Sequence, residues 1–509
     1  MPENILAKLK KNIQPQWKVC FISAIIIGLI AHFYKITNWL PNWDSLVFRY
    51  DEQNMLSMGR WFLPVASAPS SFYDLPWLAG LMAIVFHALG AVCICKMFSV
   101  KKGTTAALIG ALVAAFPTVT SVMCYNYVAD SYAMSFLFAC LAAMFLTNKR
   151  PKFILSVVFI ALSVGIYQAY ITVTIMLLLC YLIIDLLKNQ TKVGDTLIKT
   201  VKFLSAGALG MVLYYLVLVI LLKITGTQLL EYQGFDTATS LTGLNLWASL
   251  YIIKEAFINY FFDFSNGINL FSILNIVVFG VTAVVYIADI IKNKLKFSKI
   301  LLLLVLILLL PIGATVLSLI NCAIDYHNLM KMGYLVFYLF LILQYEKIDS
   351  NTKISILKSW AIVIISAVLV FNYILIANVS YHKLNMAYEK SYATLVKISD
   401  RIEQTDGAIN CDSIMVLGAL EQSQAYSASL PPDITGTTDG YILRADDETV
   451  GQSVLCSTLN DYCGTNYKFI AGDAKKALLE NDRVSGLENW PSKNSIVIID
   501  NVIVIKLGD

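Results

Sequence analysis

Long apolar runs separated by short polar loops occupy the chain from about residue 19 to residue 378. A helix needs about 20 predominantly apolar residues to cross the hydrocarbon core of a bilayer, and most of these runs approach that length. The pattern therefore predicts an all-α polytopic membrane protein. The eleven predicted spans are roughly 19–36, 77–98, 105–123, 131–147, 153–166, 169–187, 203–223, 270–291, 299–319, 328–345 and 359–378.

For one pair of predicted spans, the pattern does not decide between one helix and two. The run from 153 to 187 holds Gly165, Tyr167 and Gln168 near its middle. It predicts either one tilted helix or two short helices broken at that point. A break would place Tyr167 and Gln168 at the outer rim or in a cavity, because irregular backbone at membrane depth is tolerated only there.

The long apolar runs stop near residue 380. A polar run with helical spacing reaches about Gln404, and strand-like runs follow at 413–417 and 495–505 among Gly-, Asp- and Thr-rich loops. This change predicts a small C-terminal α/β domain. The expected parts are an N-terminal segment at 1–18, a membrane domain at 19–378 with a first outer loop at 37–76 and an interfacial loop at 224–268, and the C-terminal domain at 379–509.

The loop at 224–268 carries one further predicted element. Residues 244–262 have the spacing of an amphipathic helix, with Lys254 and Glu255 on the polar side, which is typical of a helix lying in the bilayer interface.

Composition supports a membrane protein and excludes a nucleic-acid-binding one. The chain is 58% hydrophobic with a mean hydropathy of +0.68. Its net charge of +4 is spread over short loops rather than gathered in a patch, so we expect no nucleic acid partner. The expected partner of the apolar surface is the lipid bilayer.

The positions of Lys and Arg predict the orientation. If the N-terminus is cytoplasmic, the inner loops hold the basic residues at 96–102, 149–152, 188–202, 292–299 and 347–358, whereas the outer connections at 124–130, 166–170 and 320–328 hold none. Basic loops stay on the cytoplasmic side. The C-terminal domain is then extracytoplasmic, where disulfides persist. The sequence leaves open whether it contains one disulfide among Cys411, Cys456 and Cys463.

The first outer loop gathers charge in a chain that is only 14% charged. If residues 44–58 form a helix on the membrane surface, Asp44 and Asp51 share a face because they are seven residues apart. We interpret Asp44, Asp51 and Glu52 as a general base with supporting acids that orient it or bind a cation. The alternative is that these acids are solvated or balanced by nearby arginines.

Other candidate groups lie at the predicted outer ends of spans. Asp130, beside Tyr125, either caps the N-terminus of its helix or faces a cavity shared with Asp44. His327 and Lys331 are four residues apart and would share a helical face, where they could hold a phosphate. Snorkelling of Lys331 to the interface is the alternative. Arg60 is a second phosphate-binding candidate, and no histidine–carboxylate spacing indicates a zinc site.

Two short segments, and the order of features along the chain, match a known pattern. The first outer loop contains Trp43-Asp44-Ser45-Leu46 and Ser57-Met58-Gly59-Arg60-Trp61-Phe62-Leu63-Pro64. Phe116-Pro117 leading to Tyr125 and Asp130, and Tyr167-Gln168, match more loosely. Over about residues 15–350 the chain resembles the GT-C membrane glycosyltransferases, and within them the type II glucosyltransferase family that modifies bacterial surface polysaccharides such as O-antigen. The C-terminal domain shows no specific match.

The resemblance implies an inverting transfer of a hexose, expected to be glucose, from a polyprenyl-phosphate donor such as undecaprenyl-phosphate glucose to a surface polysaccharide. Asp44 matches the catalytic Asp of the first outer loop. Substrate would contact Arg60, Trp61, Tyr125, Asp130, Tyr167 and Gln168. We expect His327 and Lys331 to bind the lipid phosphate together with Arg60. This expectation rests on their charge and hydrogen-bonding chemistry, since no family motif matches at these two positions.

The resemblance leaves the cofactor open and implies a location. GT-C enzymes divide on the need for a divalent cation (Mg or Mn), and Asp51, Glu52 and Asp130 are the available ligands here. The expected location is the bacterial cytoplasmic membrane. A flippase and a polyprenyl-phosphate glucose synthase are candidate partners, because a donor made on the inner face must reach the outer one.

Two other classes fit a polytopic chain. A lipid-linked sugar flippase or other transporter is expected to show paired repeats and broken helices in matching halves, and the sequence shows neither. A polysaccharide polymerase or ligase keeps its arginines in a large central outer loop, whereas the loop at 224–268 has Lys254 and no arginine. The glycosyltransferase interpretation therefore leads.

Overall fold

The computed structural model describes residues 13–148, 152–230, 246–265, 267–320, 326–348, 352–420, 432–437, 442–443 and 451–509. The chain forms two compact units. Unit 1 comprises Met1–Thr37, Tyr50–Asn378 and Leu430–Thr435, and unit 2 comprises Asn38–Arg49, Val379–Ser429 and Gly436–Asp509. The first loop of the chain is therefore shared between the two units.

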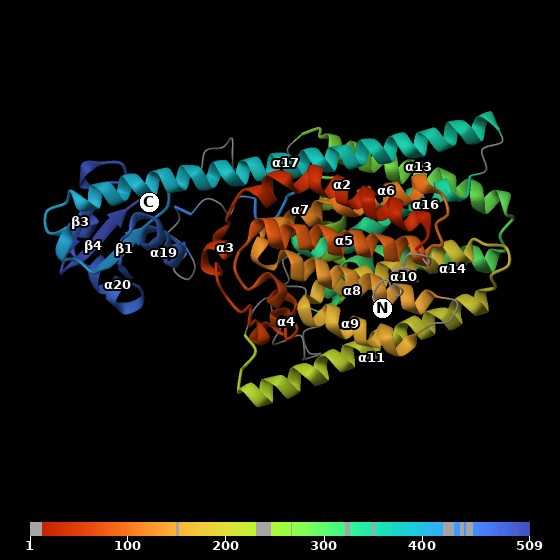
Figure 1. Ribbon diagram of the computed structural model, residues 1–509, viewed down its shortest axis with the longest axis horizontal. Coiled ribbons are helices and arrows are strands. Elements are labelled where there is room, and N and C mark those ends of the chain that lie inside the picture. The colour runs from red at the N-terminus through yellow and green to blue at the C-terminus, as the bar shows by residue number, and fades with distance from the viewer. Residues whose placement is uncertain are drawn as a thin grey trace, which may run out of the picture. The chain divides into compact units, whose positions relative to one another are not determined.

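Unit 1 is a bundle of long apolar helices that lie side by side (Figure 1). They are α2 (Pro15–Thr37), α5 (Pro76–Met97), α6 (Gly103–Ala115), α7 (Pro117–Cys124), α8 (Ala129–Thr147), α9 (Phe153–Ile166), α10 (Ile171–Leu186), α11 (Val193–Thr225), α13 (Leu270–Lys292), α14 (Phe297–Ala314), α16 (Leu335–Glu346) and the part of α17 (Lys353–Glu403) up to Asn378. Within the described residues, 10 helices are long and apolar enough to cross a membrane, and α9 is a shorter apolar helix. The predicted polytopic all-α fold is confirmed.

The open pair of spans proves to be two short helices. Tyr167 has an extended backbone (φ −151°, ψ 115°) that ends α9, and the 3-10 turn η4 (Gln168–Tyr170) then leads into α10. The predicted span at 105–123 is also divided, because Pro117 lacks the N–H that a continuous helix would need, and α7 starts there.

Two further spans begin with a 3-10 turn. The turn η3 (Asn126–Val128) precedes α8, and η7 (Asn328–Tyr334) precedes α16. The turns η4 and η7 pack against each other, and α7 packs on η7. We call η3, η4 and η7 together the rim. The backbone hydrogen bonds of a 3-10 turn have poorer geometry than those of an α-helix. Such turns within a membrane span are tolerated where other parts of the protein cover them or where they line a polar cavity, so we expect these surroundings at the rim.

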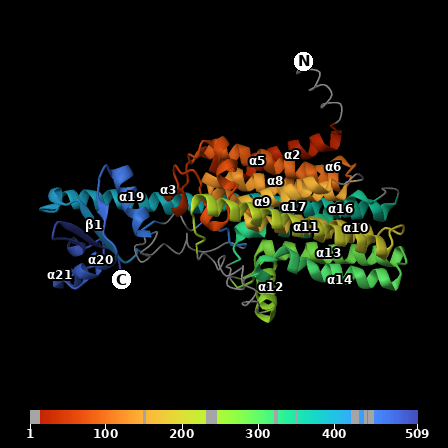
Figure 2. The same cartoon turned by 90° about the horizontal axis from the view of Figure 1, so that it is seen from below.

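The predicted amphipathic helix is present as α12 (Leu246–Phe261). It runs crosswise to α13 and α14 (Figure 2). Ser249, Ile253 and Tyr260 are buried on one face, whereas Lys254 is exposed. Residues 231–245 and Asn266 of the predicted interfacial loop lie outside the described residues.

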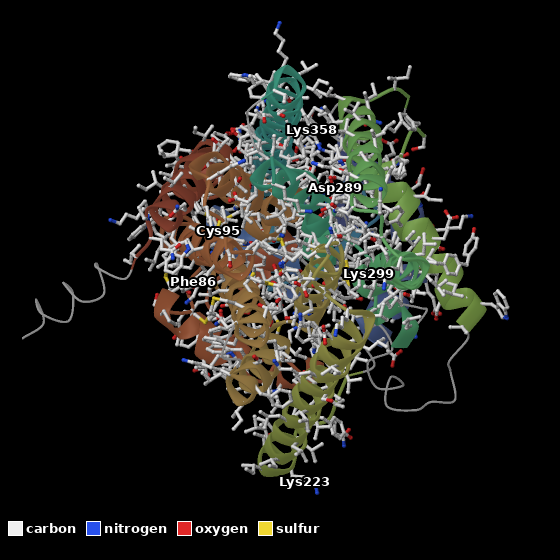
Figure 3. The ribbon with its side chains drawn as sticks, turned by 90° about the vertical axis from the view of Figure 1, so that its right-hand side faces the viewer. Phe86, Cys95, Lys223, Asp289, Lys299 and Lys358 are labelled. Carbon is white, nitrogen blue, oxygen red and sulfur yellow. The ribbon has the colours of Figure 1, made fainter. Side chains whose placement is uncertain are left out.

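The lysine-bearing loops lie at the end of the bundle opposite the rim. Hydrogen bonds and ion pairs join four of these loops: Lys101–Glu346, Lys347–Asp289 and Lys299–Lys188. Figure 3 looks onto this end, where Asp289, Lys299 and Lys358 are labelled. The basic loops on which the predicted orientation rests therefore lie together at one end of the folded bundle.

Unit 2 contains a four-stranded sheet of order β2-β1-β4-β3. The strands are β1 (Ser413–Leu417), β2 (Lys468–Phe469), β3 (Ile496–Ile499) and β4 (Val502–Lys506). β1 is parallel to β2 and β4, and β3 is antiparallel to β4. The predicted small α/β domain is confirmed. The run at 495–505, predicted as one strand, is a hairpin with Asp500 and Asn501 at positive φ, as tight two-residue turns require.

The sheet is covered on both faces, and the strand period of two decides which residues go where. Ile414 and Val416 of β1 face a core that also contains residues of α17 and of α19 (Gly451–Cys463), whereas Met415 faces Val484 and Leu487 on the other side. Cys411, Cys456 and Cys463 are all free thiols, so the possible disulfide among them is absent.

Replacing Gly110 by alanine should destabilise unit 1. A Cβ at this position would lie 2.3 Å from the carbonyl oxygen of Cys20, because α2 and α6 approach each other closely there. We expect a loss of about 1–3 kcal/mol, the usual cost of overpacking. Thermal unfolding in detergent measures it. Gly207→Ala is the control, since nothing lies within 4 Å of its added methyl. Equal melting temperatures for wild type and Gly110→Ala would contradict the close approach.

Candidate active site

The first loop does not form the predicted helix over 44–58. The helix α3 covers only Trp43–Val47, and Phe48 leaves the helical region at φ −99° and ψ 34°. Beyond it, the Asp51 carboxylate accepts a hydrogen bond of 2.6 Å from the backbone N–H of Gln53, which has φ +53°. Such local side-chain to backbone bonds compete with helix formation. The prediction that Asp44 and Asp51 share a helical face was therefore wrong.

The break in the loop separates the predicted acids. Asp44 belongs to unit 2, where Asn42 caps α3 by accepting from the Ser45 N–H at 2.8 Å and Leu46 is buried in the core of the sheet domain. Asp44 itself is half-buried. Asp51 and Glu52 belong to unit 1, Asp51 half-buried and Glu52 exposed. Unit 2 thus supplies one candidate acid and unit 1 the others.

Arg60 is held against the rim by aromatic rings. Its Nη1 donates a hydrogen bond of 3.0 Å to the phenol oxygen of Tyr132, and its guanidinium carbon lies 4.9 Å from the centroid of the Tyr167 ring. Tyr132 and Tyr167 are themselves stacked, with centroids 4.4 Å apart and planes 5° apart. A guanidinium over an aromatic face is favourable, so the Tyr167 ring stabilises the charge of Arg60 at this position.

Trp61 lies against a glycine at the end of α9. A Cβ on Gly165 would come within 2.7 Å of the Trp61 indole, so only glycine permits this approach. The backbone N–H of Phe62 donates to the Gly165 carbonyl at 2.8 Å. Gly59, at φ +75°, supplies the left-handed turn that lets the chain reverse before Arg60. The Gly-Arg-Trp segment is therefore fixed to the break between α9 and α10.

Two more hydrogen bonds secure the same segment. The Gln168 amide nitrogen donates to the Met58 carbonyl at 2.7 Å, and the Tyr214 hydroxyl of α11 donates to the Gly59 carbonyl at 3.0 Å. Arg60, Trp61, Tyr167 and Gln168, all singled out from the sequence, are thus brought together in unit 1.

Asp130 is fully buried in the first turn of α8. Its Oδ1 accepts a hydrogen bond of 2.8 Å from the Ser131 N–H, whereas its Oδ2 has no hydrogen-bond partner among the described residues. The Ser131 hydroxyl bonds that of Ser67 at 2.8 Å, which attaches the first loop to α8. An acid in this position also interacts favourably with the N-terminal end of the helix dipole. Tyr125, which precedes η3, is half-buried.

A buried charged group near the rim was missed by the sequence analysis. Lys35 of α2 is fully buried and interacts electrostatically with Asp74, which is 8% exposed. Asp74 Oδ1 accepts a hydrogen bond of 2.6 Å from the Asn126 amide of η3. Buried charges need such partners. The available signal was a lysine inside an apolar run, close to an acid that immediately precedes the next span.

His327 and Lys331 do not share an α-helical face. η7 is a 3-10 turn, in which residues three apart rather than four apart lie above one another, and the Lys331 backbone is non-helical at φ −92° and ψ 16°. The prediction of a shared face was therefore wrong. Lys331 instead places its Nζ 5.4 Å from the ring centroid of Tyr260 of α12, and both His327 and Lys331 are half-buried.

Between these two residues, Asn328 connects three segments. Its Oδ1 accepts from the Thr118 hydroxyl of α7 at 3.0 Å. Its amide nitrogen donates to the Asp433 carbonyl at 2.8 Å, and its backbone N–H donates to the Thr435 hydroxyl at 2.9 Å. Asp433 and Thr435, which belong to unit 1 although Gly436 and the residues after it belong to unit 2, thus fix the start of η7. This role was not predicted.

The described acids are not arranged as a metal site. Throughout the part of the chain that the structure describes, no three His, Cys, Asp or Glu side chains gather closely enough to hold a metal ion. Asp51, Glu52 and Asp130, the candidate ligands from the sequence, are all described and do not form such a group.

Comparison with known proteins gives one match. The family model described as "Glucosyl transferase GtrII" matches residues 33–344. This range contains the first loop with Asp44 and Arg60, and the whole rim. No curated protein sequence and no solved structure matches the chain.

A double-mutant cycle should reveal the bond between Arg60 and Tyr132. Arg60→Met, Tyr132→Phe and the double variant should show a coupling of about 1.5–3 kcal/mol in unfolding free energy, as for hydrogen bonds to charged groups. Denaturant unfolding in detergent gives the three values. The control cycle uses Lys254→Met and Glu255→Gln, an exposed pair on α12 with 3.4 Å between charged atoms, expected to couple by about 0–1 kcal/mol. Equal coupling in both cycles would count against the assignment.

Proposed function

Because the chain belongs to the GtrII glucosyl transferase family and is a multi-pass membrane protein, we propose that it transfers glucose from a polyprenyl-phosphate donor to a surface polysaccharide at the outer face of the bacterial cytoplasmic membrane. The observation that carries the proposal is the family match over residues 33–344, which spans Asp44, the Gly-Arg-Trp segment and the rim. In this proposal the N-terminus is cytoplasmic and unit 2 is extracytoplasmic, and a donor synthase and a flippase supply the lipid-linked sugar.

The proposed step is a single displacement. A hydroxyl oxygen of the acceptor attacks the anomeric carbon of glucose and forms the new C–O bond. The bond from that carbon to the phosphate oxygen breaks, and polyprenyl phosphate leaves with the bonding electrons. The hydroxyl proton passes to a carboxylate. Attack opposite the leaving group inverts the anomeric configuration.

We assign the carboxylate to Asp44. A general base must be reached by the hydroxyl that it deprotonates. Asp44 is half-buried at the start of a short capped helix, whereas Asp130 and Asp74 are buried. Asp51 and Glu52 are the supporting acids in this proposal.

We assign the leaving phosphate to Arg60, Lys331 and His327 in unit 1. The stacked ring of Tyr167 and the phenol of Tyr132 fix the Arg60 guanidinium in unit 1. Lys331 likewise lies over an aromatic ring. Cations in partly buried surroundings interact more strongly with a developing negative charge than they would in water. Of the residues that the sequence assigned to the substrate, the half-buried Trp61, Tyr125 and Gln168 would contact the sugar, whereas Asp130 and Tyr167 are buried.

Asp44→Asn should abolish transfer while leaving the protein folded, because an amide cannot accept the hydroxyl proton. General-base catalysis contributes about 100–10,000-fold, and a loss in this range is expected. The assay incubates purified protein with polyprenyl-phosphate glucose and surface polysaccharide, and measures release of polyprenyl phosphate. Asp51→Asn and Asp130→Asn are run beside it and should lose less.

The same assay can contradict the assignment. Full activity in Asp44→Asn combined with loss in Asp51→Asn or Glu52→Gln would move the base to unit 1. No release by wild type with any donor, together with movement of the lipid-linked sugar across proteoliposomes, would favour a flippase.

Lys331→Met should raise the KM for the donor and also lower kcat, because it removes a cation that meets the phosphate charge of the bound donor and the further charge that develops as the phosphate leaves. A hydrogen bond to a charged group of about 1.5–3 kcal/mol corresponds to roughly 10- to 100-fold. Lys254→Met is the matched control, since Lys254 also lies over a ring, 5.5 Å from the centroid of Tyr251, but is exposed on α12. An unchanged donor KM in Lys331→Met would remove Lys331 from the phosphate site.

A further inference from the structure

The residues on either side of α3 meet on the surface of unit 2. The Arg49 guanidinium carbon lies 5.4 Å from the Trp39 ring centroid and 5.3 Å from that of Tyr462, a residue of α19. Its Nη1 forms an ion pair of 3.0 Å with Asp461. Arg49 Nε has no hydrogen-bond partner among the described residues. One arginine is thus placed on two aromatic rings, with a carboxylate at its end.

Two tyrosines of α17 extend this surface. Tyr388 packs edge-on against Trp39 at 5.9 Å between centroids, and Tyr392 stacks on Tyr388 at 6.4 Å and contacts Tyr462 at 5.7 Å. We call Trp39, Arg49, Tyr388, Tyr392, Asp461 and Tyr462 the aromatic platform. All of them belong to unit 2.

The outer part of the platform is open to solvent. Tyr392 and Tyr462 are 38% and 36% exposed, and the side chains of Arg49 and Asp461 are 37% and 46% exposed. By contrast, the core beneath is mostly aliphatic, with Leu395 and Leu459 completely buried. Burial in the core therefore does not account for the outer rings, and exposed clusters of this kind usually mark binding surfaces.

The chemistry of the platform selects a neutral, hydroxyl-rich ligand. The partly exposed rings of Tyr392 and Tyr462 can pack against the C–H groups of a sugar ring, while the Tyr392 hydroxyl and the Arg49–Asp461 pair provide donors and acceptors for its hydroxyls. The pair cancels its own charge, so a phosphate would have to compete with Asp461 for Arg49. A few fixed polar groups on an apolar surface are the usual composition of a small-molecule site.

We propose that the aromatic platform binds the acceptor polysaccharide. The inference rests on the proposed function, because that function requires a sugar hydroxyl as acceptor. It goes further in placing acceptor recognition in unit 2, on residues that flank Asp44 in the sequence at 39 and 49. The loop that carries the base thereby also contributes to holding the hydroxyl that the base deprotonates.

The test uses the full-length protein and the surface polysaccharide purified from the cells that produce it. Binding is measured by calorimetry for wild type, Tyr462→Ala and Arg49→Gln. Loss of ring contact or of the arginine should weaken binding at least tenfold. Arg401→Gln is the matched control, since its guanidinium also lies on a ring, 4.7 Å from the Trp490 centroid in the same unit, but outside the platform. Its binding should equal that of wild type.

Kinetics separate the platform from the proposed function. Tyr462→Ala and Arg49→Gln should raise the KM for polysaccharide while leaving the donor KM and the slow hydrolysis of donor by water unchanged, because water needs no platform. Tyr462→Phe, which keeps the ring, should retain most binding even if the alanine variant unfolds.

Each outcome has a distinct meaning. Polysaccharide binding that Tyr462→Ala and Arg49→Gln both retain, or that wild type lacks, overturns the proposal. Binding that depends on the platform in a protein that never consumes donor supports the platform while the proposed function fails. Capture of a protein partner in place of the glycan, lost in Tyr462→Ala, would overturn the glycan assignment.

Discussion

The position of Arg60 against the rim depends on one close approach, that of the Trp61 indole to the Cα of Gly165. The approach is possible because the residue at 165 has no side chain, and it brings the Phe62 N–H to the Gly165 carbonyl. Once Trp61 lies there, Arg60 can donate to Tyr132 and lie over Tyr167. The position of the cation in the candidate site thus follows from steric contact between an aromatic ring and a helix end.

The same contact accounts for the break between α9 and α10. A continuous helix through Tyr167 would leave no backbone turn for Trp61 to cover. The extended Tyr167 and the 3-10 turn after it instead leave backbone N–H and C=O groups outside the helical hydrogen-bond pattern, and at membrane depth these groups need other partners. The Met58 and Gly59 carbonyls are satisfied in return by Gln168 and Tyr214. The Gly-Arg-Trp segment and the break between α9 and α10 therefore stabilise each other. These bonds explain how a segment that contains Arg60 can pack against an apolar bundle instead of extending into water.

The sequence predicted what long-range patterns determine and missed what single contacts determine. The spans and the C-terminal strands follow from periods that extend over many residues. The helix over 44–58 failed because α3 already ends at Val47, and the Gln53 N–H then donates to the Asp51 carboxylate, a local bond that competes with helix formation. The shared face of His327 and Lys331 failed because spacing alone cannot distinguish a 3-10 turn from an α-helix. Lys35 and Asp74 were missed because a lysine inside an apolar run does not by itself identify a partner that lies far away in the sequence.

The division of the first loop has a consequence for how the candidate residues work. Leu46 is buried in the core of unit 2, so the position of Asp44 is determined by the sheet domain rather than by the membrane bundle. Arg60 and Lys331, by contrast, are positioned by contacts within the bundle. In the proposed function, the carboxylate and the cations thus belong to different folding units. Substitutions in the sheet domain can therefore change the surroundings of Asp44 without altering the contacts that hold Arg60 and Lys331.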